Sequence, residues 1–190
     1  MLDGIRSRKN FLETIEFWPH EGKYHYTGHR NCNVCLNPKD SMKLKGICPK
    51  CGNKLTIGVA ERIEELADRP EGSVPENAVP FKNIIPLSEV IAGTIGEKVE
   101  SKKTWEEYNK LIAKFGNEFE VILNAEEDGL KRVANEKIAS NIIRNRNQKI
   151  PFKPGYDGVY GVPIFDFENF KEETEDNSIR KRQTGLDEFL

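Results

Sequence analysis

The sequence lacks any long apolar run. No stretch of its 190 residues approaches 18 consecutive apolar residues, which argues against a membrane-spanning helix. Its beginning also lacks the basic, apolar and small-residue pattern of a signal peptide. We therefore expect a cytoplasmic protein with no membrane partner. The apolar fraction of 37% is modest and 32% of residues are charged, so the core is expected to be small.

Charge is spread unevenly along the chain, although the net charge is only −2. Residues 1–60 carry 10 Lys and Arg against 5 Asp and Glu, whereas residues 166–190 carry 4 against 8. A basic part beside an acidic one is compatible with nucleic-acid binding. On charge alone, an ordinary solvated surface explains the pattern equally well.

Cysteine is scarce, and all four cysteines fall into two C-x2-C pairs. In a reducing compartment, pairs with this spacing are typical of metal ligands rather than disulfides. Two intervening residues let a tight turn direct both sulfurs at one tetrahedral ion. The pattern predicts one structural zinc ion with no open coordination position, and an iron–sulfur cluster is the less favoured alternative. The predicted ligands are Cys32, Cys35, Cys48 and Cys51.

The order of apolar patterns and turn residues predicts an α+β protein. We expect short strands near residues 11–18 and 119–123, and one long helix over about 126–147. The predicted segments are an N-terminal strand segment over 1–18, a small zinc-ribbon module over 19–60, a mainly helical domain with a β-turn element over 61–165, a flexible, disordered linker over 166–182 and a short amphipathic peptide over 183–190.

Aromatic and basic residues alternate just before the first cysteine. Side chains interleaved in this way can stack on bases and neutralise phosphates. The alternative is that they pack against the zinc module. A second metal site at the three histidines would lack a nearby acidic cluster to complete it. The predicted nucleic-acid-binding residues are Lys23, Tyr24, His25, Tyr26, His29 and Arg30.

The last eight residues combine a glutamine with an apolar cluster. In a helical turn Leu186, Phe189 and Leu190 share one face, and Gln183 is free for polar contacts beside it. The pattern resembles the peptide with which partners bind the PCNA-type sliding clamp. Leu190 departs from that pattern, because an aromatic residue is more usual there. The alternative is a C-terminal helix that docks on the protein's own core.

Several longer runs resemble the C-terminal half of endonuclease Q, a DNA-repair nuclease family of archaea and some bacteria. The resemblance covers most of residues 10–165, and its runs are more specific than the cysteine pairs alone. These runs are T-I-E-F at 14–17, G-K-Y-H-Y at 22–26, G-H-R-N-C at 28–32, E-E-L-A-D-R-P-E-G at 64–72 and P-G-Y-D-G-V-Y-G at 154–161.

The resemblance implies incision of DNA beside deaminated bases or abasic sites, and recruitment by the sliding clamp. It assigns the chemistry to an N-terminal metal-dependent domain, and this sequence has no His-x-His pair of that kind. We therefore expect the DNA-binding and clamp-tethering part of such a nuclease, unable to cut DNA alone, with a separate catalytic chain as a candidate partner. The alternative from another class is a zinc-ribbon adaptor for protein contacts without a DNA role. An RNA-binding ribbon would leave the tail unexplained.

Overall fold

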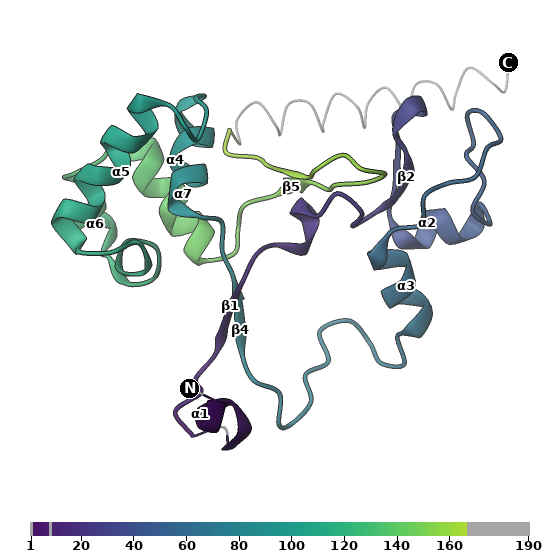
Figure 1. Cartoon of the computed structure of the whole chain (residues 1–190), viewed down its shortest axis with the longest axis horizontal. Coiled ribbons are helices and arrows are strands. Elements are labelled where there is room, and N and C mark those ends of the chain that lie inside the picture. The colour runs from purple at the N-terminus through teal and green to yellow at the C-terminus, as the bar shows by residue number, and fades with distance from the viewer. Residues whose placement is uncertain (1, 8, 167–190) are drawn as a thin grey trace, which may run out of the picture. The chain divides into compact units, whose positions relative to one another are not determined.

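A computed structural model describes residues 2–7 and 9–166 and shows a mixed α and β structure (Figure 1). The described residues form two units. The first contains residues up to Pro86 together with Asn145–Pro163, and the second contains Leu87–Arg144 with the described residues from Ile164 onward. The chain thus leaves the first unit and later returns to it, and the predicted domain bounds stay a prediction. The predicted linker, apart from Asp166, and the peptide over 183–190 lie outside the described residues.

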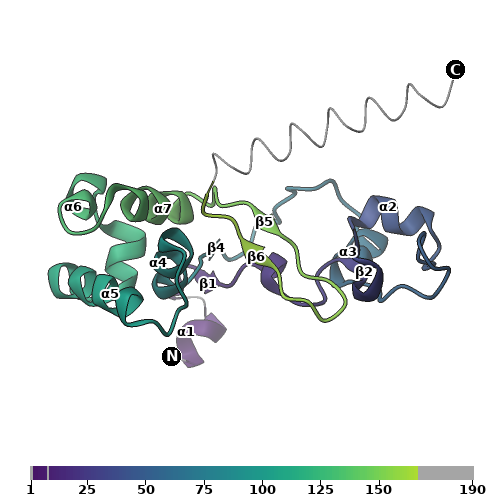
Figure 2. The same ribbon diagram turned by 90° about the horizontal axis from the view of Figure 1, so that it is seen from above.

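The first unit is built from short elements. Its three two-stranded sheets pair β1 with β4 in parallel, β2 with β3 antiparallel, and β5 with β6 antiparallel. The strand expected within 11–18 is present as β1, and its partner β4 comes from the proline-rich segment, as both views show (Figures 1 and 2). The elements are α1 (Leu2–Ser7), β1 (Thr14–Glu16), η1 (Pro19–Glu21), β2 (Thr27–His29), η2 (Arg30–Cys32), β3 (Val34–Leu36), α2 (Pro38–Lys43), α3 (Val59–Leu66), β4 (Phe81–Asn83), β5 (Phe152–Lys153) and β6 (Val162–Pro163).

A buried asparagine holds the returning segment in the first unit. The Asn145 side chain is 1% exposed. Its amide nitrogen donates to the Ile85 carbonyl at 2.8 Å, and its oxygen accepts from the Ile85 N–H at 2.9 Å. The side chain therefore completes the backbone hydrogen bonds of Ile85 just after β4, as a neighbouring strand would.

The second unit is helical and contains most of the apolar core. Ser101 caps α5 by accepting the Thr104 N–H at 3.2 Å, and the helix ends at Gly116, whose φ is +95°. Its elements are α4 (Leu87–Ile95), α5 (Lys102–Phe115), the π-helix η3 (Glu120–Asn124), α6 (Glu127–Lys131) and α7 (Glu136–Arg146), whose last residues belong to the first unit. Fully buried side chains include Val90, Ile91, Leu111, Val121, Ile122, Leu130, Ile138 and Ile142.

Two secondary-structure predictions were wrong in this unit. The strand expected at 119–123 is the π-helix η3, in which the successive residues Val121 and Ile122 are both buried. A short apolar run does not distinguish a strand from a buried helical turn. The long helix expected over 126–147 is two helices, because Asn135 accepts the Ile138 N–H at 2.8 Å and starts α7 anew.

No helix among the described residues is long and apolar enough to cross a membrane.

Candidate metal centre and the surface beside it

The first turn of the candidate metal centre follows the β2–β3 hairpin. His29 pairs with Val34 across the hairpin, and Gly28 pairs with Cys35. Between the strands, η2 ends at Cys32, and Asn33 takes the left-handed conformation with φ +50°. Asparagine tolerates that conformation better than most residues, so the chain can turn sharply just after Cys32.

The second turn contains the other cysteine pair. The Cys48 N–H donates to the Asn53 carbonyl at 2.7 Å, and the Gly52 N–H donates to the Cys48 carbonyl at 2.9 Å. Gly52, just after Cys51, has φ +73°, a conformation that glycine adopts without steric cost. Lys50 Nζ donates to the Cys32 carbonyl at 2.8 Å, which links this turn to the first one.

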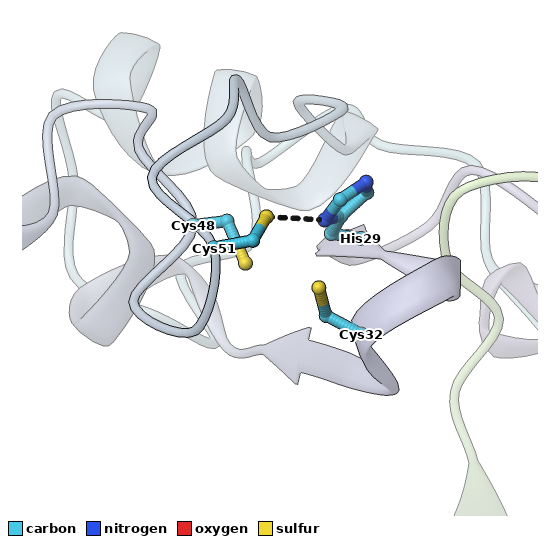
Figure 3. Close-up of side chains that lie close together, drawn as sticks. All are labelled: His29, Cys32, Cys48 and Cys51. Atoms are coloured by element: carbon cyan, nitrogen blue, oxygen red, sulfur yellow. Dashed lines mark hydrogen bonds between the residues drawn. The ribbon is translucent and has the colours of Figure 1, made fainter.

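The two turns bring together one histidine and three cysteines. The ligand atoms of His29, Cys32, Cys48 and Cys51 all lie within 4.8 Å of one another (Figure 3). The Cys51 Sγ is 3.3 Å from His29 Nδ1. In a tetrahedral zinc site with Zn–S bonds of about 2.3 Å, ligand atoms are about 3.8 Å apart. Four such donors fit a structural zinc site with small side-chain movements.

The local environment lowers the pKa of one thiol in this cluster. Burial raises the pKa of Cys48, but backbone N–H groups of Lys50 and Cys51 donate to its sulfur and bring the pKa down to about 6. The thiolate is the form that binds metal, so these donors favour metal binding at neutral pH.

The cluster differs from the predicted ligand set at one position. Cys35 is not among the four, and His29 stands with the three other cysteines. Successive side chains alternate across a strand, and the preceding residue Val34 is buried, so Cys35 is directed to the opposite face. Its Sγ lies 3.9 Å from the Pro154 carbonyl, and burial raises its pKa. The overlooked signal was H-x2-C spacing at residues 29–32, the same interval as in the cysteine pairs.

The module around the cluster has little core of its own. Val34, Cys48 and Leu55 are its buried apolar residues, with Cys32 and Leu36 packed against them. So small a core is typical of modules that depend on a metal for stability.

A glycine-containing loop, residues 154–161, docks against the segment before the cluster. Amides of Gly155, Gly158 and Gly161 donate to the carbonyls of residues 20, 23 and 21 at 2.8, 2.9 and 3.0 Å. A Cβ on Gly161 would collide with the His20 carbonyl, and one on Gly155 would collide with the Gly22 carbonyl. The P-G-Y-D-G-V-Y-G run is thus explained by close backbone approach.

Asp157 fastens this loop to the metal module. Its carboxylate accepts the Arg30 backbone N–H at 2.7 Å and the Thr56 hydroxyl at 2.6 Å. The Thr56 hydroxyl and then the Arg30 N–H lower the pKa of Asp157. The ionised carboxylate therefore holds the loop beside the hairpin.

The predicted nucleic-acid-binding residues are distributed over three environments. Lys23, Tyr24 and Arg30 are exposed. His25 and Tyr26 are half-buried, with their rings stacked at a centroid distance of 5.0 Å. Their role in binding DNA stays a prediction.

The two histidines among the predicted nucleic-acid-binding residues lie in different surroundings. Burial, and then the charge of His20, lower the pKa of His25 to about 4, so its ring is neutral at physiological pH. His29 belongs to the metal cluster.

The structure adds Tyr160 to the exposed residues of this surface. Lys23 Nζ lies 5.6 Å from the centre of the Tyr24 ring and 5.7 Å from that of Tyr160. The sequence did not predict this neighbour, because it comes from the distant 154–161 loop.

The fold and the cluster define a mixed α and β protein with a candidate structural metal centre of one His and three Cys. Residues 86–149 match the family described as the MJ0043 C-terminal domain. The chain is 38% identical over 149 residues to the uncharacterized protein MJ0043 of Methanocaldococcus jannaschii, covering 77% of this chain and 18% of that protein. It is 34% identical over 141 residues to the uncharacterized protein YqxK of Bacillus subtilis, covering 74% of this chain and 32% of that protein.

Two solved structures extend the similarity to endonuclease Q. The lesion-specific endonuclease Q of Pyrococcus furiosus superposes with a TM-score of 0.75 and 31% identity, over 89% of this chain and 42% of that chain. The second structure is an endonuclease Q complex with a 27-mer duplex substrate that has an abasic lesion at the active site. It superposes with a TM-score of 0.72 and 30% identity, over 87% of this chain and 42% of that chain. The similarity that the sequence runs indicated therefore extends over most of the chain. The chain spans less than half the length of each of these relatives, and its match to a C-terminal half stays a prediction.

Proposed function

We propose that this chain is the DNA-binding and clamp-tethering part of an endonuclease Q-like repair nuclease that acts at deaminated bases or abasic sites. The observation that carries the proposal is the similarity over 89% of the chain to a lesion-specific endonuclease. A relative with comparable similarity binds duplex DNA with an abasic lesion.

In this proposal the metal centre is structural. His29, Cys32, Cys48 and Cys51 would hold one zinc ion, which would fix the hairpin and the turn that follows it. Four protein ligands fill a tetrahedral site and leave no position for a water nucleophile. The ion would keep Arg30 and the docked loop in place on the surface that we propose contacts DNA.

Charge and exposure favour Lys23 and Arg30 as the phosphate contacts. Two lysines of the cysteine module already have partners, because Lys43 pairs with Asp40 at 2.8 Å and Lys50 donates to a backbone carbonyl. Lys23 and Arg30 are exposed on adjoining segments that the 154–161 loop connects.

Salt-dependent DNA binding tests this proposal. We expect affinity for a lesion-containing duplex to fall steeply with salt concentration, and Lys23→Gln to reduce the slope by about one phosphate contact. Lys102→Gln is the matched control, because that side chain is 91% exposed on α5 in the second unit. Absence of salt-dependent binding would refute the proposal and favour the protein-interaction adaptor.

Incision belongs to a separate test. We propose that this sequence alone does not cut DNA, because a thiolate-rich structural zinc site does not activate water. The purified protein is incubated with uracil- or inosine-containing duplex and Mg²⁺ or Mn²⁺. Specific nicking that persists through repurification would contradict this part of the proposal.

We further propose that residues 183–190 tether the chain to a PCNA-type sliding clamp. Support comes from the sequence pattern, in which a helical turn would place Leu186, Phe189 and Leu190 on one apolar face. Burying each side chain contributes about 1.5–3 kcal/mol, so alanine at Leu186 or Phe189 is expected to weaken clamp binding about 10- to 150-fold. Thr184→Ala is the control, and calorimetry with a purified clamp is the measurement. Equal affinities for all variants would contradict the tether.

A further inference from the structure

We propose that Tyr24 and Tyr160, with the Lys23 ammonium within cation–π distance of both rings, form a stacking site for an unpaired DNA base. The inference deepens the proposed function and rests on it, since it specifies which form of DNA this surface recognises. Lys23 Nζ is 5.6 Å from one ring centre and 5.7 Å from the other. Both distances are within the range of cation–π attraction, so a single cation is near both rings.

Both rings are available to a ligand. Tyr160 is 68% exposed and Tyr24 is 48% exposed. Neither contributes to the buried core, so their aromatic surface is not explained by packing. Among the residues that the structure describes, no ion pair involves Lys23, so its charge remains available to a phosphate.

The two tyrosines are carried by segments that hydrogen bonds join to each other. The Gly158 N–H donates to the Lys23 carbonyl at 2.9 Å, and Tyr156 and Val159 exchange backbone hydrogen bonds of 3.0 and 2.8 Å. Asp157 ties the same turn to the hairpin. A site that is already ordered loses less conformational entropy when a ligand binds.

A second cation, that of Arg30, lies near Gly158, as does the Tyr24 hydroxyl. A Cβ placed on Gly158 would be 3.4 Å from Arg30 Nη1 and 3.9 Å from the Tyr24 hydroxyl, so both groups lie over this glycine. Two exposed aromatic faces with two adjacent cations match the chemistry of a nucleotide, which joins a π face to a phosphate.

An unpaired base is the occupant that this chemistry selects. Bases within a duplex stack on one another and expose only their edges in the grooves, whereas an unpaired base offers its face. A base opposite an abasic lesion has no pairing partner, and such a lesion is present in the DNA bound by one structural relative. The proposed site thus suits DNA at a position where pairing is lost.

Two labelled oligonucleotides of equal length separate base stacking from phosphate attraction. One is oligothymidine of about twelve nucleotides, and the other has the same phosphates on abasic tetrahydrofuran spacers. Fluorescence anisotropy with the full chain is expected to show tighter binding to oligothymidine. Tyr160→Ala should weaken oligothymidine binding about 5- to 150-fold and leave the abasic oligomer nearly unaffected. Tyr160→Phe should retain the preference, and Tyr160→Leu should lose it.

Phe17→Ala is the matched control, because Phe17 is 69% exposed in the same unit and lies on a different segment. Thermal unfolding of each variant identifies any loss of folding, and the Leu and Phe variants provide the comparison if the Ala variant unfolds. Equal wild-type affinity for the two oligomers would overturn the stacking site. Salt-dependent binding to both oligomers in that case would still sustain the proposed function. Equal weakening of both by Tyr160→Ala would also overturn the stacking site. Absence of binding to both oligomers would also overturn the stacking site, whereas the proposed function is decided separately by salt-dependent binding to the lesion-containing duplex.

Discussion

Replacing His29 and Cys35 in turn determines which residue completes the metal centre. The structure places His29 with Cys32, Cys48 and Cys51, with ligand atoms within 4.8 Å of one another, and directs Cys35 elsewhere. We therefore expect His29→Ala to lose tight zinc binding and Cys35→Ser to retain it.

The size of the effect follows from the small core of the module. Burial of Val34 and Leu55 contributes about 1.5–3 kcal/mol each, whereas a structural zinc ion contributes about 10–16 kcal/mol to folding. If the four ligands contribute equally, losing one costs about 2.5–4 kcal/mol, which is roughly a 100- to 1,000-fold loss in affinity. Full removal of zinc should unfold the module.

Zinc content and competition with a chelator measure this difference. Wild type and Cys35→Ser should each keep about one zinc per chain after dialysis and release it at similar chelator concentrations. His29→Ala should release it at chelator concentrations lower by about two orders of magnitude. The reverse result, with zinc lost from Cys35→Ser and kept by His29→Ala, would refute the structural ligand set and establish four cysteines as ligands.

Three further substitutions test the local electrostatics and packing. Burial and then His20 lower the pKa of His25 from 6.5 to about 4, so the unfolded chain binds more protons between these pH values and stability falls as pH falls through them. Urea unfolding at pH 7 and pH 5 should show that His25→Phe reduces this loss of stability, by on the order of 1 kcal/mol after solvent screening. An unchanged loss of stability would contradict the lowered pKa of His25. Asp157→Ala removes the hydrogen bonds to Arg30 and Thr56. It should lower the free energy of unfolding by about 1–3 kcal/mol at pH 7, where the carboxylate is ionised. A change below about 0.5 kcal/mol would show that other contacts hold the loop. Gly129→Ala in α6 should raise the free energy of unfolding by up to about 1 kcal/mol, because alanine has the higher helix propensity. The added Cβ would meet Phe115 at an ordinary 3.5 Å, so destabilisation would indicate a closer contact there.

The sequence alone predicted features that depend on residues close together in the chain. The metal character of the cysteine pairs follows from ligand spacing and turn chemistry. The β-turn-β element is present as β5 and β6. The sequence runs that resemble endonuclease Q predicted the similarity to the solved endonuclease Q structure, which covers 89% of this chain.

Tertiary structure decided which distant side chains meet. His29 stands with the cysteines and Cys35 does not, because strand alternation and the buried Val34 orient this part of the hairpin. Tyr160 reaches Lys23 because three glycines let the 154–161 loop approach another backbone closely. Residue spacing in the sequence determines which side chains share one turn, whereas strand orientation and long-range backbone packing determine which side chains lie opposite that turn. The metal ligands and the proposed base-stacking site depend on both.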